Sequence, residues 1–170
     1  MNYNADVYVR VRESEEDGME NIIKITTHSF SETENVGKML AAAMQGGGFV
    51  AFCGDLGAGK TAFTRGMGEI LCPEAEVCSP TYAIINEYKK DGKTVLCHVD
   101  AYRISDDDDL YSTGFYDCLD YENCVMAVEW CENIPFAVPS DAVRVTISKL
   151  GESKRLITIE NAPAGLEATV

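Results

Sequence analysis

The amino-acid sequence predicts an α/β domain with a mixed β-sheet that is parallel in its centre and extended by antiparallel hairpins. Two short apolar segments, 49–53 and 125–128, have the composition of strands buried on both faces of a sheet. Segments with helical spacing alternate with strands in the first half of the chain. In the second half, paired segments of alternating polarity flank turn residues, which is typical of hairpins.

The first half of the domain is expected to open with a strand at 22–26. A helix follows, with Ser31 as its first capping residue, because Ser31 and Glu34 have the spacing of a capping box. A glycine triplet ends this helix and precedes the apolar strand at 49–53. A glycine-rich turn then leads into a second helix over 60–71, whose apolar residues recur on one side.

The second half is expected to contain two hairpins. Asp91-Gly92 is a two-residue turn signal between strands at 82–88 and 94–99. The other hairpin, formed by strands at 143–148 and 155–159, closes the sheet near the end of the chain.

Length and composition suit one globular unit. The chain has 170 residues and a mass of 18.6 kDa, enough for one sizeable hydrophobic core. Its 46% apolar and 25% charged residues exclude disorder throughout. The formal charge is −14, from 14 lysines and arginines against 28 acidic residues. Phosphate backbones and anionic lipid repel so acidic a chain, which disfavours charge-driven binding to nucleic acid or a membrane surface.

The cellular setting is expected to be cytoplasmic. No apolar run approaches the roughly 20 residues that span a bilayer, and residues 1–18 are polar and acidic, unlike a signal peptide. The seven cysteines are an odd number and contain no C-x-x-C pair. They indicate free thiols of a reducing compartment, with a zinc site as the less favoured alternative because the usual ligand spacing is missing.

Three regions follow from these patterns. Residues 1–20 are acidic with little periodicity and are expected to be a flexible extension. A short edge strand is the alternative, because the valines at 7, 9 and 11 alternate with other residues. The folded domain spans 21–162, and 163–170 form a C-terminal tail.

The clearest motif is the phosphate-binding pattern G-x-x-x-x-G-K-[ST], which the chain satisfies with Gly54-Asp55-Leu56-Gly57-Ala58-Gly59-Lys60-Thr61. An apolar strand precedes it and a helix follows, so a chance glycine loop is the weaker alternative. In such a P-loop, backbone N–H groups and the helix N-terminus surround phosphate oxygens. The candidate nucleotide-binding residues are Asp55, Leu56, Gly57, Ala58, Gly59, Lys60, Thr61 and Ala62.

Hydrolysis of a bound nucleotide needs further groups at the metal and the water. Glu129 and Asp100 each end an apolar strand, where ligands of open α/β sheets lie; a solvated acid at a strand end is the alternative. Thr81, in Ser79-Pro80-Thr81-Tyr82, offers a hydroxyl for sensing a γ-phosphate, or belongs to an ordinary turn. Roles for His98, Arg103 and Trp130 stay open, with core packing favoured for the tryptophan.

Absent motifs narrow the class of nucleotide-binding protein. The chain lacks an N-K-x-D guanine motif, and its six arginines are scattered rather than gathered in a lid. It is too short for a helicase or transporter motor. A compact ATPase that acts with another protein remains, with a stand-alone kinase or nucleotidase and a non-enzymatic nucleotide sensor as alternatives.

Four ordered motifs carry a family resemblance. They are the P-loop at 54–61, Ser79-Pro80-Thr81-Tyr82 with Asn86-Glu87-Tyr88, His98-Val99-Asp100-Ala101-Tyr102-Arg103, and Val128-Glu129-Trp130. In order and spacing they resemble the TsaE (YjeE) family over about residues 24–160. The chain departs from that pattern at Ala101, where leucine is usual, at Cys131, where proline is common, and in its N-terminal extension.

The resemblance implies a P-loop NTPase-like three-layer fold and a role in making N6-threonylcarbamoyladenosine in tRNA. It implies a small ATPase that works with the TsaB and TsaD proteins, meets tRNA only indirectly, and hydrolyses ATP to ADP slowly until its partners stimulate it. By position, Lys60 would bind phosphates, and Thr61 and Glu129 would hold Mg²⁺. Asp100 would position water, and Thr81 would belong to a switch-like segment.

Overall fold

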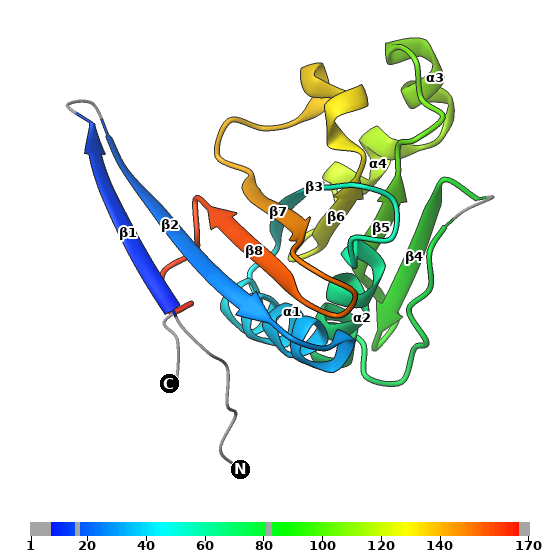
Figure 1. Ribbon diagram of the computed structural model, residues 1–170. Helices are drawn as coiled ribbons and strands as arrows, with labels where there is room; N and C mark the ends of the chain where they lie inside the picture. Colours follow the sequence, from blue (N-terminus) through cyan, green and yellow to red (C-terminus); the bar gives the residue numbers. More distant parts are fainter. Residues whose placement is uncertain (1–7, 16–17, 81–82, 167–170) are drawn as a thin grey trace.

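The computed structural model describes residues 8–15, 18–80 and 83–166 (Figure 1). Within these residues, eight strands form one sheet in the order β1-β2-β8-β7-β3-β6-β5-β4. The central strand β3 (Gly48–Cys53) pairs in parallel with β6 (Val125–Glu129) and β7 (Val143–Lys149), and β6 pairs in parallel with β5 (Lys93–Asp100). The parallel centre is therefore confirmed.

Antiparallel strands extend the sheet on both sides. On one side, β8 (Arg155–Glu160) forms a hairpin with β7, followed by β2 (Gly18–Thr27) and β1 (Tyr8–Glu15). On the other side, β4 (Ile85–Lys90) forms the expected hairpin with β5, with positive φ angles of 51° and 79° at Asp91 and Gly92. The mixed sheet with antiparallel additions is thus confirmed.

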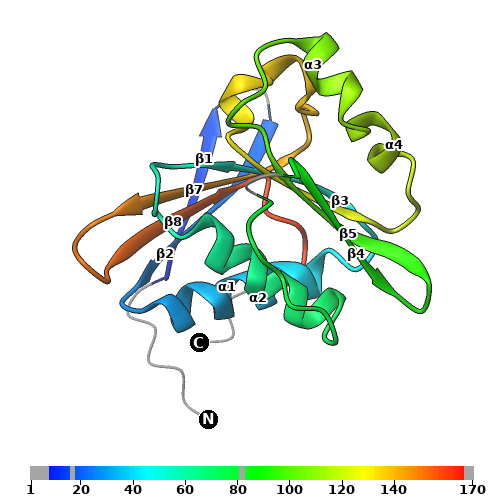
Figure 2. The same cartoon turned by 90° about the vertical axis from the view of Figure 1, so that its right-hand side faces the viewer.

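Helices cover both faces of the sheet and complete the expected three layers (Figure 2). The helices α1 (Phe30–Ala43) and α2 (Lys60–Leu71) share one hydrophobic core with the sheet. The short helices α3 (Asp107–Ser112) and α4 (Phe115–Leu119) cover a second core on the opposite face. Two 3₁₀ turns, η1 (Cys131–Asn133) and η2 (Pro135–Ala137), connect β6 to β7. No helix in the described parts of the chain is long and apolar enough to cross a membrane.

The N-terminal cap of α1 corrects the expectation for Ser31. Ser29 is the cap: its Oγ accepts from the Glu32 backbone N–H at 3.1 Å, and a Glu32 carboxylate oxygen accepts from the His28 N–H at 2.8 Å. Ser29 and Glu32 have the same three-residue spacing as the pair expected from sequence. Glu34 does not cap, because its carboxylate pairs instead with Arg65 of α2 at 2.8 Å.

The N-terminal region also differs from the expected flexible extension. Residues 8–15 pair along the whole of 18–25, and β2 pairs in turn with β8. An open strand edge presents unpaired N–H and C=O groups, and each added strand satisfies them. The edge-strand alternative therefore describes residues 8–15, and the strand runs further than the valine alternation indicated; the valine at position 7 lies outside the described residues.

The expected C-terminal tail is partly folded onto the core. The Ala162 N–H donates to the Asn21 carbonyl at 3.0 Å, which returns the chain to the start of β2. Leu166 is then only 3% exposed and packs in the core beneath α1 and α2. Burial of this leucine holds residues 163–166 against the core beyond the last strand; 167–170 lie outside the described residues.

The contact between α1 and α2 requires a glycine at position 66. A Cβ placed on Gly66 of α2 would lie 1.9 Å from the Glu34 carbonyl oxygen of α1, so the two helices approach too closely for alanine. We expect Gly66→Ala to lower the free energy of unfolding in urea by about 1–3 kcal/mol, as overpacking typically does. Gly46→Ala is the matched control, because nothing lies within 4 Å of its Cβ. Equal unfolding midpoints for the two variants would contradict this packing.

Candidate functional site

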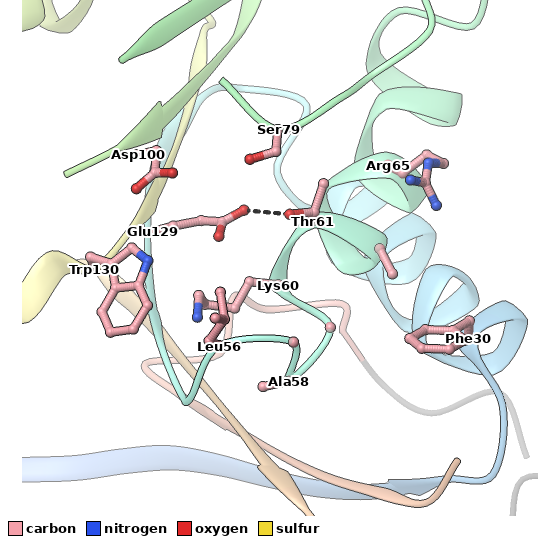
Figure 3. Close-up of a pocket in the computed structure, with 13 residues that line it drawn as sticks. Phe30, Leu56, Ala58, Lys60, Thr61, Arg65, Ser79, Asp100, Glu129 and Trp130 are labelled. Atoms are coloured by element: carbon pink, nitrogen blue, oxygen red, sulfur yellow. Dashed lines mark hydrogen bonds between the residues drawn. The ribbon is translucent and has the colours of Figure 1, made fainter. Parts of the chain in front are cut away.

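A cavity of about 530 Å³ lies at the carboxyl ends of β3, β5 and β6, over the first turn of α2 (Figure 3). Parallel strands that end at one edge place their following residues together, and this edge is where ligands of open α/β sheets bind. The cavity is lined by Phe30, Leu56, Gly57, Ala58, Gly59, Lys60, Thr61, Ala62, Arg65, Ser79, Asp100, Glu129 and Trp130.

The glycine-rich turn forms one wall of this cavity. Gly54 begins the turn with a φ of 137°, and a Cβ there would lie 2.5 Å from the Ile147 carbonyl oxygen, so only glycine fits. The Ala58 N–H closes the turn on the Asp55 carbonyl at 3.0 Å. Helix α2 then starts after Gly59, which provides no side-chain cap. The first N–H groups of α2 are therefore left for an anion in the cavity.

Lys60 places a positive charge in the cavity. Its side chain is only 4% exposed, and its Nζ donates to the carbonyls of Gly54 at 2.6 Å and Asp55 at 3.2 Å. The ammonium also lies 4.4 Å from the centre of the Trp130 ring. Carbonyl dipoles and an aromatic face stabilise a buried cation only in part, so this ammonium attracts an anion. Trp130 thus lines the cavity and also packs, partly buried, against the second core, so the core role favoured from sequence describes one side of the residue.

Thr61 and Glu129 meet across the cavity. The Thr61 hydroxyl donates to Glu129 Oε1 at 2.9 Å, and His98 Nε2 lies 2.8 Å from the same oxygen. His98 is fully buried, and its Nδ1 lies 3.1 Å from the Cys78 carbonyl. The imidazole therefore orients the Glu129 carboxylate from behind. A hydroxyl and a carboxylate this close are the kind of oxygen ligands that hard divalent cations prefer.

Asp100 adds a second carboxylate to the same end of the cavity. It pairs in register with Glu129 across β5 and β6, and its Oδ1 accepts from the Tyr102 N–H at 3.1 Å. Ser79 lies opposite, so the segment after α2 closes this end (Figure 3). Thr81 lies outside the described residues. Asp55 does not line the cavity, but its carbonyl holds Lys60.

Comparison with known proteins shows which family combines this glycine-rich turn with these acidic residues. A family model described as "Threonylcarbamoyl adenosine biosynthesis protein TsaE" matches residues 27–157. The chain belongs to the TsaE family. Its members act in the biosynthesis of threonylcarbamoyladenosine in tRNA, so the resemblance seen in the four motifs is confirmed.

The alignments with curated TsaE-family relatives cover most of this chain and most of each relative. A tRNA threonylcarbamoyladenosine biosynthesis protein TsaE of Bacillus subtilis is 36% identical over 137 residues, covering 80% of this chain and 84% of the relative. The TsaE of Rickettsia conorii is 33% identical over 135 residues, with coverages of 79% and 75%. A crystal structure of Bacillus subtilis YdiB has a TM-score of 0.70 at 30% identity and covers 86% of this chain and 89% of that one.

Several residues of this TsaE-family site carry no sequence signal. Phe30 and Arg65 line the cavity, although neither belongs to a recognised motif. Two cations from the terminal hairpin hold the glycine-rich turn: Arg155 Nε donates to the Ala58 carbonyl at 2.8 Å, and Lys149 Nζ donates to the Leu56 carbonyl at 2.7 Å. These contacts join residues more than 90 positions apart, so local spacing gives no hint of them.

Proposed function

We propose that this chain is a small Mg²⁺-dependent ATPase required for the threonylcarbamoyl modification of adenosine in tRNA, acting with the TsaB and TsaD proteins. One observation carries the ATPase part: the glycine-rich turn, the buried Lys60 ammonium and the Thr61–Glu129 pair open into a single cavity. Family membership supports the pathway.

The groups that line the cavity support binding of ATP or ADP with Mg²⁺. Backbone N–H groups at the start of α2 and the Lys60 ammonium would hold phosphate oxygens. Thr61 Oγ1 and Glu129 Oε1, which are 2.9 Å apart, would hold the metal ion. When bound, Mg²⁺ neutralises negative charge that develops on the phosphates.

Asp100 is the residue that we assign to the attacking water. It lines the same end of the cavity as Glu129, and its carboxylate has one oxygen engaged by the Tyr102 N–H. Among the described residues the other oxygen has no hydrogen-bond partner, so it could accept a proton or orient a water molecule beside the γ-phosphate. We expect slow hydrolysis by the isolated chain, because part of the site would be completed in the complex with its partners.

The polarity of the cavity supports a proposed position for the nucleoside. Both carboxylates and Ser79 occupy one end, and Phe30 occupies the other (Figure 3). Phe30 is 58% exposed, although one side of its ring faces the Arg155 guanidinium, with 5.7 Å between the guanidinium carbon and the ring centre. With the phosphates on Lys60, the base extends toward Phe30, where an aromatic ring offers a stacking surface.

Phe30→Ala should weaken ADP binding roughly 5- to 150-fold, the usual range for loss of one base–aromatic stack. Tripolyphosphate, which has no base, should bind Phe30→Ala and the unmodified chain alike in calorimetry. Phe30→Trp should restore ADP affinity, and Phe136→Ala is the control, because that ring is also exposed, at 54%, but outside the cavity. Equal losses for ADP and tripolyphosphate would show that Phe30 supports the turn rather than the base.

The acidic surface suits a protein that acts through partners. A formal charge of −14 repels tRNA, so contact with RNA would be indirect and the partner proteins would hold it. On this proposal the protein works in the cytoplasm, where tRNA is modified.

The decisive experiment measures ATP turnover by the chain with and without the TsaB–TsaD pair. We expect a clear rise with the pair and no rise when Lys60→Ala replaces the unmodified chain. No stimulation by cognate partners would contradict the proposal. A small metabolite that alone accelerates ATP consumption about tenfold, equivalent to about 1.4 kcal/mol of barrier, would favour a stand-alone kinase instead.

A further inference from the structure

We propose that Cys53 and Cys131 form a peroxide-sensitive thiol pair, whose disulfide ties the start of the glycine-rich turn to the segment that follows Glu129. All seven cysteines are free thiols in the structure. The modification itself does not depend on the proposed function, whereas its effect on nucleotide binding does.

The fold brings these two thiols together. Cys53 is the last residue of β3, and Cys131 is the first residue of η1, two positions after the end of β6. Trp130 turns the chain with a φ of 60°, which places the Cys131 sulfur 3.5 Å from that of Cys53. The Phe52 carbonyl oxygen lies 3.4 Å from the Cys131 sulfur and is the alternative acceptor for its single S–H. A disulfide has an S–S bond of about 2.05 Å, so closure needs a movement of roughly 1.5 Å.

The two sulfurs have different roles in the reaction. Cys53 is half-buried, and the hydrogen bond from Cys131 lowers its pKa to about 7, with the nearby Arg144 guanidinium acting in the same direction. Its thiolate attacks hydrogen peroxide, which gives a sulfenic acid and hydroxide. The buried Cys131 thiol then attacks the Cys53 sulfur, the S–O bond breaks, and water leaves. Overall, two thiols and one peroxide give one disulfide and two waters.

A second thiol contact in the molecule provides an internal comparison. Cys97 and Cys124 lie 3.6 Å apart, almost the same distance, but both are buried, at 0% and 6% exposure. In both pairs, hydrogen bonds among the thiols lower the pKa of one member, Cys53 or Cys124, and raise that of the other, Cys131 or Cys97. The pairs therefore differ in exposure, because peroxide reaches the half-buried Cys53 faster than a buried thiol. The Cys53–Cys131 pair should therefore oxidise first.

A bound metal ion is the competing use of these thiols. A carboxylate oxygen of Glu132 and the two sulfurs all lie within 4.8 Å of one another. Glu132 is exposed, and three such ligands leave a fourth position open, unlike closed structural zinc sites. Disulfide formation needs neither Glu132 nor a metal ion, so Glu132→Gln and a chelator separate the two possibilities.

The disulfide would act on the cavity through both ends of the link. Gly54 follows Cys53 directly, and its carbonyl holds the Lys60 ammonium at 2.6 Å. Glu129, which meets Thr61, lies two residues before Cys131. A shift of roughly 1 Å at these points, part of the closure expected for a disulfide, misplaces the phosphate-binding and metal-binding groups together. We therefore expect oxidation to weaken ADP–Mg²⁺ binding at least fivefold.

The test treats the full chain with hydrogen peroxide in the presence of a chelator, followed by non-reducing peptide mapping. A Cys78→Ser background removes an exposed thiol that would react with other molecules. We expect a linked Cys53–Cys131 peptide in this background and in Glu132→Gln, reversed by dithiothreitol and absent from Cys53→Ser and Cys131→Ser. A Cys97–Cys124 link formed first, or no intramolecular link, would overturn the proposal. Circular dichroism checks that the serine variants are folded, and Cys53→Ala replaces any that are not.

Calorimetry with ADP and Mg²⁺ then separates the two proposals. Weaker binding after oxidation, restored by dithiothreitol and unaffected by peroxide in Cys53→Ser, supports the coupling. Unchanged affinity of the linked protein would overturn the coupling. Absence of nucleotide binding by the reduced protein would count against the proposed function, while the linked peptide would still establish the thiol pair.

Discussion

Lys60→Ala should reduce ATP and ADP affinity at least 100-fold and abolish partner-stimulated turnover. The side chain is buried at the cavity wall, and charge-assisted hydrogen bonds to phosphate contribute about 1.5–3 kcal/mol each. Calorimetry with ADP and Mg²⁺ measures this loss directly. Since the turn would keep its glycines and its contacts with Arg155 and Lys149, the variant should remain folded.

Lys38→Ala is the matched control for this experiment. Lys38 lies on α1, away from the cavity, and forms a partly exposed salt bridge of 2.7 Å with Glu69. Exposed pairs of this kind typically contribute less than about 1 kcal/mol to stability, so nucleotide affinity should be unchanged. If Lys60→Ala kept its ADP affinity and Lys38→Ala lost it, the phosphates would have to bind away from the glycine-rich turn, which would contradict the prediction.

Asp100→Asn should lower the rate of ATP hydrolysis about 10²- to 10⁴-fold, the range typical of a lost general base. Its effect on ADP affinity should stay within about threefold, because the proposed work of Asp100 belongs to the transition state. Asparagine keeps the size of the side chain and can still accept from the Tyr102 N–H. Single-turnover kinetics with ATP, beside ADP calorimetry, measures the two effects.

Asp141→Asn makes the same chemical change at an exposed turn and should alter neither quantity. Equal losses of binding and hydrolysis in Asp100→Asn would assign Asp100 to nucleotide binding. If Asp100→Asn hydrolyses ATP at an unchanged rate, Asp100 does not position the attacking water, and Glu129 becomes the candidate from the cavity lining. Glu129 itself is a poor subject for this comparison, because its contacts with Thr61 and His98 tie catalysis to metal binding.

Expectations that rested on local chemistry agree well with the structure. The helix over 60–71 and the Asp91-Gly92 hairpin lie where they were expected, because helical periodicity and a two-residue turn are encoded by neighbours. The predicted cap of α1, Ser31, was wrong, and Ser29 is the cap. Each of these serines has a glutamate three residues later, so the sequence pattern fits both. Only the Glu34–Arg65 pair between α1 and α2 favours one of them.

The family, the parallel centre of the sheet and the glycine-rich turn could all be predicted from the amino-acid sequence, since each depends on residue types in a short or strictly ordered pattern. The distant groups that complete the cavity are visible only in the folded chain: Phe30 at one end, Arg155 and Lys149 behind the turn, and His98 behind Glu129. The same is true of the Cys53–Cys131 contact. These contacts form where the sheet brings strand ends together, and the order of the strands depends on burial over the whole chain rather than on neighbouring residues.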